Sequence, residues 1–116
     1  MINVAINGFC RIGRRVFRLL VANENIQVVA INDLADAKTL SHLLKYDSIH
    51  GVFKGDITHV DKNIIVNKTA IPLQNQNAPS RIEWSPYDVD IVIESSGKFK
   101  SKTDLMPHIT NGASQV

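Results

Sequence analysis

A glycine-rich turn and one carboxylate are the features of this sequence whose spacing could bind a nucleotide. Gly8 and Gly13 fill the first and third glycine positions of a G-x-G-x-x-G motif, and Cys10 fills the second. Such a turn presents backbone N–H groups and the positive end of a helix dipole to phosphate oxygens. Asp33 lies about 20 residues past Gly13, where an acidic residue accepts hydrogen bonds from the ribose hydroxyls of NAD and repels the 2′-phosphate of NADP. Together, these features predict a dinucleotide site.

Simpler explanations of both features remain open at this level. The glycines could serve only a tight strand-to-helix turn, and Asp33 could be a solvated turn residue or a helix cap. Cys10 also places a β-carbon and a sulfur where a glycine normally lets the backbone approach the pyrophosphate. We therefore expect Cys10 to crowd the turn, and we interpret it as an inert variant residue, although a helix N-terminus can activate a thiol.

The elements predicted around these residues place them at neighbouring strand ends. Short apolar runs predict buried parallel strands, and apolar residues at helical spacing predict helices. Leu40, Leu43 and Leu44 are spaced to share one helix face, and His42 beside them is expected to be a partly exposed residue rather than a metal ligand. The expected order is a strand at 2–7, a helix at 14–24, a strand at 26–31 and a helix at 37–45 capped by Asp33 or Asp36.

From Gly51 onward the pattern changes to short β runs separated by turn residues. This pattern predicts a small antiparallel meander and not another β-α-β unit. A loop is expected at 74–81 and a turn at Ser85-Pro86. The β runs of the meander are 52–54, 57–60, 64–66 and 70–73.

A third parallel-type strand is expected at 89–94, and it leads into Ser95 and Ser96. Ligands of open α/β sheets bind at the carboxyl ends of the strands, so Gly8, Asp33 and Ser96 would line one crevice. Taken alone, the two serines are explained equally well by turn chemistry. After them we expect a helix from Ser101 to about Asn111, bent or shortened by Pro107, and the start of one more strand at 113–116, which makes the chain look C-terminally truncated.

Length and composition are those of one soluble globular domain at most. The 116 residues carry a formal charge of +2, which is too small to indicate nucleic acid or an anionic membrane as a partner. The single cysteine excludes an internal disulfide, and the N-terminus does not resemble a secretory signal. The expected location is therefore cytoplasmic.

Four collinear segments resemble the signatures of glyceraldehyde-3-phosphate dehydrogenases. The first reads NGFCRIGR, similar to NGFGRIGR in that family; the segments are 7–14, 29–34, 44–51 and 92–99. His108, Gly112 and Ala113 fit the next helix-to-strand segment. The resemblance covers the whole chain and implies an α/β, Rossmann-type, doubly wound fold with a mainly parallel sheet and a small antiparallel β insertion. Residues 1–116 would be an incomplete NAD-binding domain, and the catalytic domain would be absent from this chain.

The resemblance also implies a cofactor site. The backbone of Arg11 and Ile12 would meet the NAD pyrophosphate, Ile12 would also pack towards the nicotinamide, and Asp33 would hold the adenosine ribose. Residues 95–97 and 99 would line the adenine side. The expected cofactor-binding residues are Asn7, Gly8, Phe9, Cys10, Arg11, Ile12, Gly13, Asn32, Asp33, Ser95, Ser96, Gly97 and Phe99; no catalytic or metal-binding residue is expected.

Departures from the family pattern put parts of this site in question. Cys10 replaces a glycine, Asn77-Ala78-Pro79 replaces arginine-aspartate-proline near the adenine, and Ser96 replaces a threonine. The second change removes a cationic contact. Because Cys10 crowds the turn, we expect these 116 residues to bind NAD poorly. His50 and His59 match no catalytic position and are expected to be surface or turn residues.

For the intact enzyme, the resemblance implies a cytoplasmic homotetramer that oxidises glyceraldehyde 3-phosphate with NAD and phosphate to 1,3-bisphosphoglycerate. Its nucleophile would be a cysteine beyond this segment, so this chain is expected to be non-catalytic. One alternative is a segment of erythrose-4-phosphate dehydrogenase. Another is a non-catalytic nucleotide-binding fragment. An RNA-binding role is weaker, because the net charge gives it no support.

Overall fold

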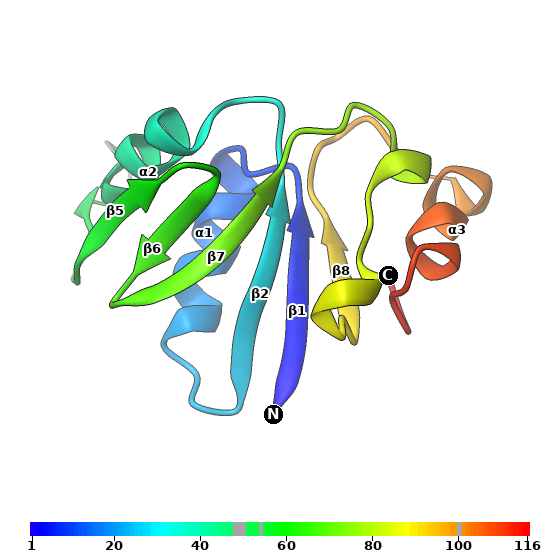
Figure 1. Ribbon diagram of the computed structural model, residues 1–116, viewed down its shortest axis with the longest axis horizontal. Helices are drawn as coiled ribbons and strands as arrows, with labels where there is room; N and C mark the ends of the chain where they lie inside the picture. The colour runs from blue at the N-terminus through cyan, green and yellow to red at the C-terminus, as the bar shows by residue number, and fades with distance from the viewer. Residues whose placement is uncertain (48–50, 54, 100) are drawn as a thin grey trace.

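A six-stranded sheet with helices packed against it forms the structure, a computed structural model that describes residues 1–47, 51–53, 55–99 and 101–116 (Figure 1). Ser48, Ile49 and His50 of the third signature, together with Lys54 and Lys100, lie outside the described residues. The sheet order is β5-β6-β7-β2-β1-β8. Its strands are β1 Ile2–Asn7, β2 Ile26–Asn32, β5 Ile57–Val60, β6 Asn63–Val66, β7 Thr69–Gln74 and β8 Ile91–Glu94.

Four neighbouring strands of this sheet are parallel and the remaining pairings are antiparallel. β1 pairs in parallel with both β2 and β8, and β2 pairs in parallel with β7. β5, β6 and β7 pair antiparallel. The helices are α1 Arg11–Val21, α2 Ala37–Lys45 and α3 Lys102–Thr110, with short 3₁₀ turns at Pro79–Arg81 and Ser85–Tyr87. The predicted mainly parallel α/β sheet with an antiparallel insertion is confirmed.

The predicted meander is only partly correct. β7 pairs antiparallel with β6 on one side, but it also joins the parallel sheet beside β2 at Ile31–Leu73 and Asn32–Gln74. The path from β2 through α2 to β7 is therefore a β-α-β crossover, with the β5–β6 hairpin inserted before the last strand. Val52 does not belong to the meander, because β4 Gly51–Val52 pairs with β3 Tyr46–Asp47.

Two helix predictions need correction. α1 begins at Arg11 rather than at residue 14, since the Arg14 N–H already donates to the Cys10 carbonyl at 2.8 Å. The glycine turn therefore leads directly into the helix. In α2, Leu40 and Leu44 are buried but Leu43 is 39% exposed, so the apolar face is narrower than predicted. Asp36, and not Asp33, caps α2, with its carboxylate accepting the Thr39 N–H at 2.7 Å.

Alternate residues of the central strands serve two separate cores. Ile6 and Ile31 pack on the side of α1 and α2, where Phe9 meets Phe17 edge to face at 5.6 Å between ring centroids. The next residue back in each strand is alanine, and Ala5 and Ala30 face the opposite core around Trp84. In Figure 1, α1 lies behind the sheet, and α3 lies at its right-hand end.

The C-terminal residues lie along the free edge of β8. Gln115 forms a parallel bridge with Ile91, and its N–H donates to the Asp90 carbonyl at 2.9 Å. This agrees with the predicted start of a further strand. The Ser101 hydroxyl caps α3 by accepting the Asp104 N–H at 3.1 Å, and Pro107 lies inside α3 without ending it. No helix in the described part of the chain has both the length and the apolarity needed to cross a membrane.

Candidate functional site

The predicted site residues come together because β2, β1 and β8 are neighbours and run in one direction. The Gly8 N–H donates to the Asn32 carbonyl at 2.8 Å, and the Ser95 N–H donates to the Asn7 carbonyl at 2.9 Å. The glycine turn is therefore flanked by the residues that end β2 and β8. This edge of the sheet is at the top of Figure 1, where β1 and β2 end.

Asp33 lies directly against the glycine turn. Its Oδ2 accepts the Phe9 N–H at 2.7 Å, and its Oδ1 accepts the Ala35 N–H at 3.0 Å. Asp33 is half-buried. Because each carboxylate oxygen can accept more than one hydrogen bond, both oxygens retain capacity for a pair of ribose hydroxyls. The glycine turn and the carboxylate are therefore close enough to contact the same nucleotide.

Close packing of the turn requires both glycines even without a ligand. Gly8 has φ +90°, and a β-carbon there would lie 2.5 Å from the Ser96 backbone. A β-carbon at Gly13 would lie 2.3 Å from the Gly8 carbonyl oxygen. The tight-turn explanation of these glycines is therefore correct, and the glycines by themselves do not indicate a ligand.

The start of α1 has the features of an anion site. Cys10 is the N-cap residue, but its side chain makes no cap hydrogen bond, and the first turn of α1 contains no acidic residue. No carboxylate within the helix therefore offsets the positive end of the dipole, which remains available to an anion. The Cys10 Sγ instead lies 3.0 Å from the Ser95 carbonyl oxygen, and the residue is exposed at the cleft.

A cleft of about 140 Å³ opens at this point between the strand ends and the loop that follows β7. Seven of the predicted residues line it: Asn7, Gly8, Cys10, Asn32, Asp33, Ser96 and Phe99. The cleft is also lined by Leu34, Gln76, Asn77 and Lys98. Lys98 is exposed, so the cleft has a cation although the family arginine near the adenine is replaced by Asn77.

The other predicted residues do not line this cleft. Phe9 is fully buried against Phe17, so only its backbone can belong to a cofactor site. The Ser95 hydroxyl points inward and donates to the Gly8 carbonyl at 2.6 Å. Gly13 is buried, whereas Arg11, Ile12 and Gly97 are exposed.

Sequence reasoning missed Leu34, Gln76 and Lys98. Leu34 and Lys98 adjoin predicted residues and could have been included on that ground. Gln76 had no signal, because its place depends on Asn32, which is 44 residues away. The Asn32 side chain accepts the Gln76 N–H at 2.9 Å and donates to the Gln76 carbonyl at 2.9 Å. Asn32 thus holds one wall of the cleft in place.

Glu94 lies beneath the cleft and has a perturbed pKa. Burial alone would raise the pKa of this carboxyl, but hydrogen bonds from His108, Asn7 and Ser96 outweigh burial and hold the pKa below its ordinary value of 4.5. The ionised carboxylate is therefore the form that the fold stabilises.

Glu94→Gln is expected to make the free energy of unfolding decline less steeply as the pH falls into the acid range. A pKa lowered by folding contributes stability that is complete above pH 4.5 and is lost as pH falls through the lower folded-state value. The free energy of unfolding of the unmodified chain should therefore decline more steeply below pH 4.5 than that of Glu94→Gln. Urea denaturation at a series of pH values measures the free energy of unfolding of both proteins. If the two free energies fall in parallel as the pH is lowered, folding does not lower the pKa of Glu94.

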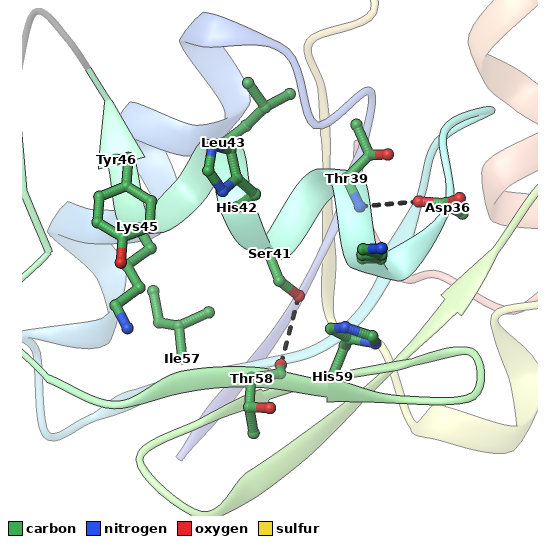
Figure 2. Close-up of a pocket in the computed structure, with 11 residues that line it drawn as sticks. Asp36, Thr39, Ser41, His42, Leu43, Lys45, Tyr46, Ile57, Thr58 and His59 are labelled. Atoms are coloured by element: carbon green, nitrogen blue, oxygen red, sulfur yellow. Dashed lines mark hydrogen bonds between the residues drawn. The ribbon is translucent and has the colours of Figure 1, made fainter.

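A larger cavity, of about 660 Å³, lies away from these residues, between α2 and β5. Figure 2 shows the Ser41 hydroxyl pointing from α2 towards β5, where it donates to the Thr58 carbonyl at 3.3 Å, and the bond from Thr39 to the capping carboxylate of Asp36. His59 points from β5 towards the first turn of α2. None of the predicted cofactor residues lines this cavity, so its size alone does not make it the nucleotide site.

Comparison with known proteins identifies the family. The family model described as "Glyceraldehyde 3-phosphate dehydrogenase, NAD binding domain" matches residues 2–102. The chain is 47% identical over 115 residues to glyceraldehyde-3-phosphate dehydrogenase 2 of Bacillus subtilis (strain 168) and 45% identical over 115 residues to that of Geobacillus stearothermophilus. Each alignment covers 99% of this chain but 34% of the relative, so the chain spans about a third of the length of these relatives. The chain therefore belongs to the NAD-binding domain family of glyceraldehyde-3-phosphate dehydrogenases, and NAD is its cofactor.

Proposed function

We propose that this chain provides the NAD-binding cleft of an enzyme that oxidises glyceraldehyde 3-phosphate with NAD and phosphate to 1,3-bisphosphoglycerate. One observation carries the proposal: the Asp33 carboxylate accepts the Phe9 N–H of the glycine turn at 2.7 Å. This contact brings a ribose acceptor and a phosphate-binding turn together at the ends of adjacent parallel strands. Dinucleotides bind at that place in folds of this type.

In this proposal, each part of the cleft holds one part of NAD. The carboxylate of Asp33 accepts hydrogen bonds from the adenosine ribose, and backbone N–H groups at the start of α1, from Arg11 and Ile12, face the pyrophosphate. Ser96 and Phe99 line the adenine side, with Lys98 as a nearby cation. The cleft is smaller than the 300–1,000 Å³ typical of a small-molecule pocket, which fits a groove that encloses only part of the dinucleotide.

The same proposal assigns no chemical step to residues 1–116. Bound NAD supplies the hydride-accepting group of the reaction. Cys10 is the one cysteine of the sequence and belongs to the turn, with its sulfur against the Ser95 carbonyl. We therefore assign residues 1–116 to the NAD-binding domain and the nucleophile to residues outside them. The proposal further takes the enzyme to be cytoplasmic and homotetrameric, as the family resemblance implies.

Titration of the purified chain with NAD and with NADP by calorimetry tests cofactor binding. We expect NAD to bind and NADP to bind at least about tenfold more weakly, since the Asp33 carboxylate repels a 2′-phosphate. Absence of NAD binding up to millimolar concentrations, or equal binding of the two nucleotides, would overturn the proposed role of the cleft.

Sequencing the transcript beyond Val116 tests the enzymatic part of the proposal. An open frame that continues into a serine-cysteine-threonine-threonine stretch would support a dehydrogenase. A stop codon directly after Val116 would leave a nucleotide-binding module without chemistry.

Cys10→Gly is expected to tighten NAD binding by about three- to tenfold. The Cys10 side chain lines the cleft at the N-terminus of α1, and its removal lets a phosphate approach the backbone more closely. Calorimetry measures the change. Cys10→Ala is the matched control, because alanine keeps the β-carbon without adding a hydroxyl that could cap α1, and it should change the affinity less than Cys10→Gly does. An unaltered or weaker affinity for Cys10→Gly would show that Cys10 does not crowd the turn.

A further inference from the structure

A chain of hydrogen bonds connects α3 to the residues beneath the cofactor cleft. His108, on α3, is completely buried and lines no part of the cleft. The Trp84 Nε1–H donates to the His108 Nδ1 at 3.0 Å, and the His108 Nε2 lies 2.8 Å from the Glu94 Oε1. This buried imidazole has no assigned part in the cofactor cleft.

The partners of His108 determine where its proton lies. An indole nitrogen can only donate, so the His108 Nδ1 must accept and carries no proton. The proton is therefore on Nε2, which donates to the Glu94 carboxylate. His108 thus acts as a fixed donor aimed at one oxygen of Glu94.

Glu94 also binds two residues that line the cleft, Asn7 and Ser96. Its Oε1 also accepts the Asn7 Nδ2–H at 2.8 Å, and its Oε2 accepts the Ser96 hydroxyl at 2.7 Å and the Ser96 N–H at 3.2 Å. The Glu94 side chain is 6% exposed. A carboxylate buried to this degree needs its donors, because an unpaired buried charge is costly.

The amide orientations follow from this carboxylate. Since Glu94 can only accept, Asn7 must turn its NH₂ group towards Glu94 and its Oδ1 towards Asn32. The Asn32 Nδ2 donates to that Oδ1 at 2.8 Å and also to the Gln76 carbonyl. The polarity set by the Glu94 carboxylate, which His108 holds, therefore extends through two buried asparagines to the loop that forms a wall of the cleft.

We propose that His108 is a positioning residue for NAD: by holding Glu94 in place, it fixes Asn7, Ser96 and the Gln76 loop in the arrangement that receives the nucleotide. This inference rests on the proposed cofactor cleft. Loss of the His108 donor would leave one position of the buried carboxylate unpaired. Glu94 would then turn towards solvent and release the side chains of Asn7 and Ser96 that it holds.

Trp84→Phe provides the control for a merely structural role. It removes the donor to the His108 Nδ1 on the far side of the ring and disturbs the same core. The accept-only carboxylate of Glu94 still favours the proton on Nε2, so the bond from His108 to Glu94 is kept. Both His108→Leu and Trp84→Phe are expected to lower the free energy of unfolding. Only His108→Leu should also weaken NAD binding.

The experiment measures NAD affinity of the full chain by calorimetry, at a temperature below the onset of unfolding of every variant. His108→Leu is expected to raise the Kd about tenfold, while Trp84→Phe should stay within about twofold. His108→Gln, whose Nε2 can still donate to Glu94, should recover most of the loss. An unchanged Kd for His108→Leu, or an equal loss in Trp84→Phe, would overturn the proposal.

A measurement without nucleotide separates this inference from the proposed function. The Asn7 side-chain amide and the Ser96 backbone amide should shift in the NMR spectrum of ligand-free His108→Leu and stay near their normal positions in Trp84→Phe. Shifts with no NAD binding by the unmodified chain would uphold the positioning of these groups and refute the cofactor role. Unshifted signals in His108→Leu would refute the inference even if the unmodified chain binds NAD.

Discussion

Gly13→Ala is expected to destabilise the protein by about 3 kcal/mol, although alanine is normally the better helix residue by about 1 kcal/mol. Gly13 lies in the first turn of α1 and is buried. An added β-carbon would lie 2.3 Å from the Gly8 carbonyl oxygen and 2.9 Å from the Ser95 Oγ. The Ser95 hydroxyl could move, but the Gly8 carbonyl is backbone and is held by the hydrogen bond from Ser95 at 2.6 Å.

The clash at Gly13 can be relieved only by separating α1 from the turn. Such a shift would carry the start of α1 away from Gly8 and would disturb the contact between the Phe9 N–H and Asp33. We therefore expect the remaining folded Gly13→Ala protein to bind NAD more weakly as well. Urea denaturation and calorimetry measure the two effects.

Gly97→Ala is the control for this substitution. Gly97 follows β8 with φ +78°, but a β-carbon there would meet no atom within 4 Å. Its cost should be limited to backbone strain of about 1–2 kcal/mol. If Gly13→Ala proves as stable as the unmodified chain, the close approach between α1 and the Gly8 carbonyl is not required by the fold.

The convergence of the strand ends was predictable because it depends on local patterns. Apolar runs located β1, β2 and β8, and the parallel arrangement places their carboxyl ends at one edge. The same logic correctly brought Gly8, Asp33 and Ser96 to one cleft. The antiparallel pairing within residues 57–74 was also predictable from the sequence, since a hairpin pairs strands that are consecutive in the chain.

The parallel pairing of β7 with β2 was not predictable from such patterns. A strand of a meander and a strand of a β-α-β crossover have the same local composition, and only the tertiary pairing of Ile31 with Leu73 distinguishes them. The inserted hairpin made the crossover look like an isolated antiparallel unit. Its recognition required knowing that β7 extends past the hairpin to Gln74.

The directions of side chains within the site could not be predicted from the sequence either. The sequence indicates that Phe9 belongs to the glycine turn and that Ser95 follows the strand β8. It does not indicate that the phenyl ring enters the core or that the Ser95 hydroxyl donates to the Gly8 carbonyl. The buried link between His108 and Glu94 has no periodic signal either. Such contacts depend on how the faces of separate elements meet, which residue spacing along one element does not specify.

Asp33→Asn is expected to raise the Kd for NAD about 10- to 100-fold and to reduce the preference for NAD over NADP. A hydrogen bond to a charged group contributes about 1.5–3 kcal/mol, and the neutral amide gives up this advantage at the ribose. The amide nitrogen would also face a backbone N–H, because the two carboxylate oxygens of Asp33 accept from Phe9 and Ala35. Loss of the negative charge removes the repulsion that disfavours a 2′-phosphate.

Asp36→Asn distinguishes this specific effect from a general change in charge. Asp36 is also a carboxylate that accepts a backbone N–H, that of Thr39 at 2.7 Å, but it caps α2 and does not line the cleft. Both variants change the net charge by the same amount, so the comparison controls for the effect of net charge on nucleotide binding. Only Asp33→Asn should alter the ratio of the NADP and NAD dissociation constants, a quantity that a partial loss of folded protein leaves unchanged. If the ratio is the same in Asp33→Asn as in the unmodified chain, Asp33 does not contact the adenosine ribose and the carboxylate serves only to fix the glycine turn.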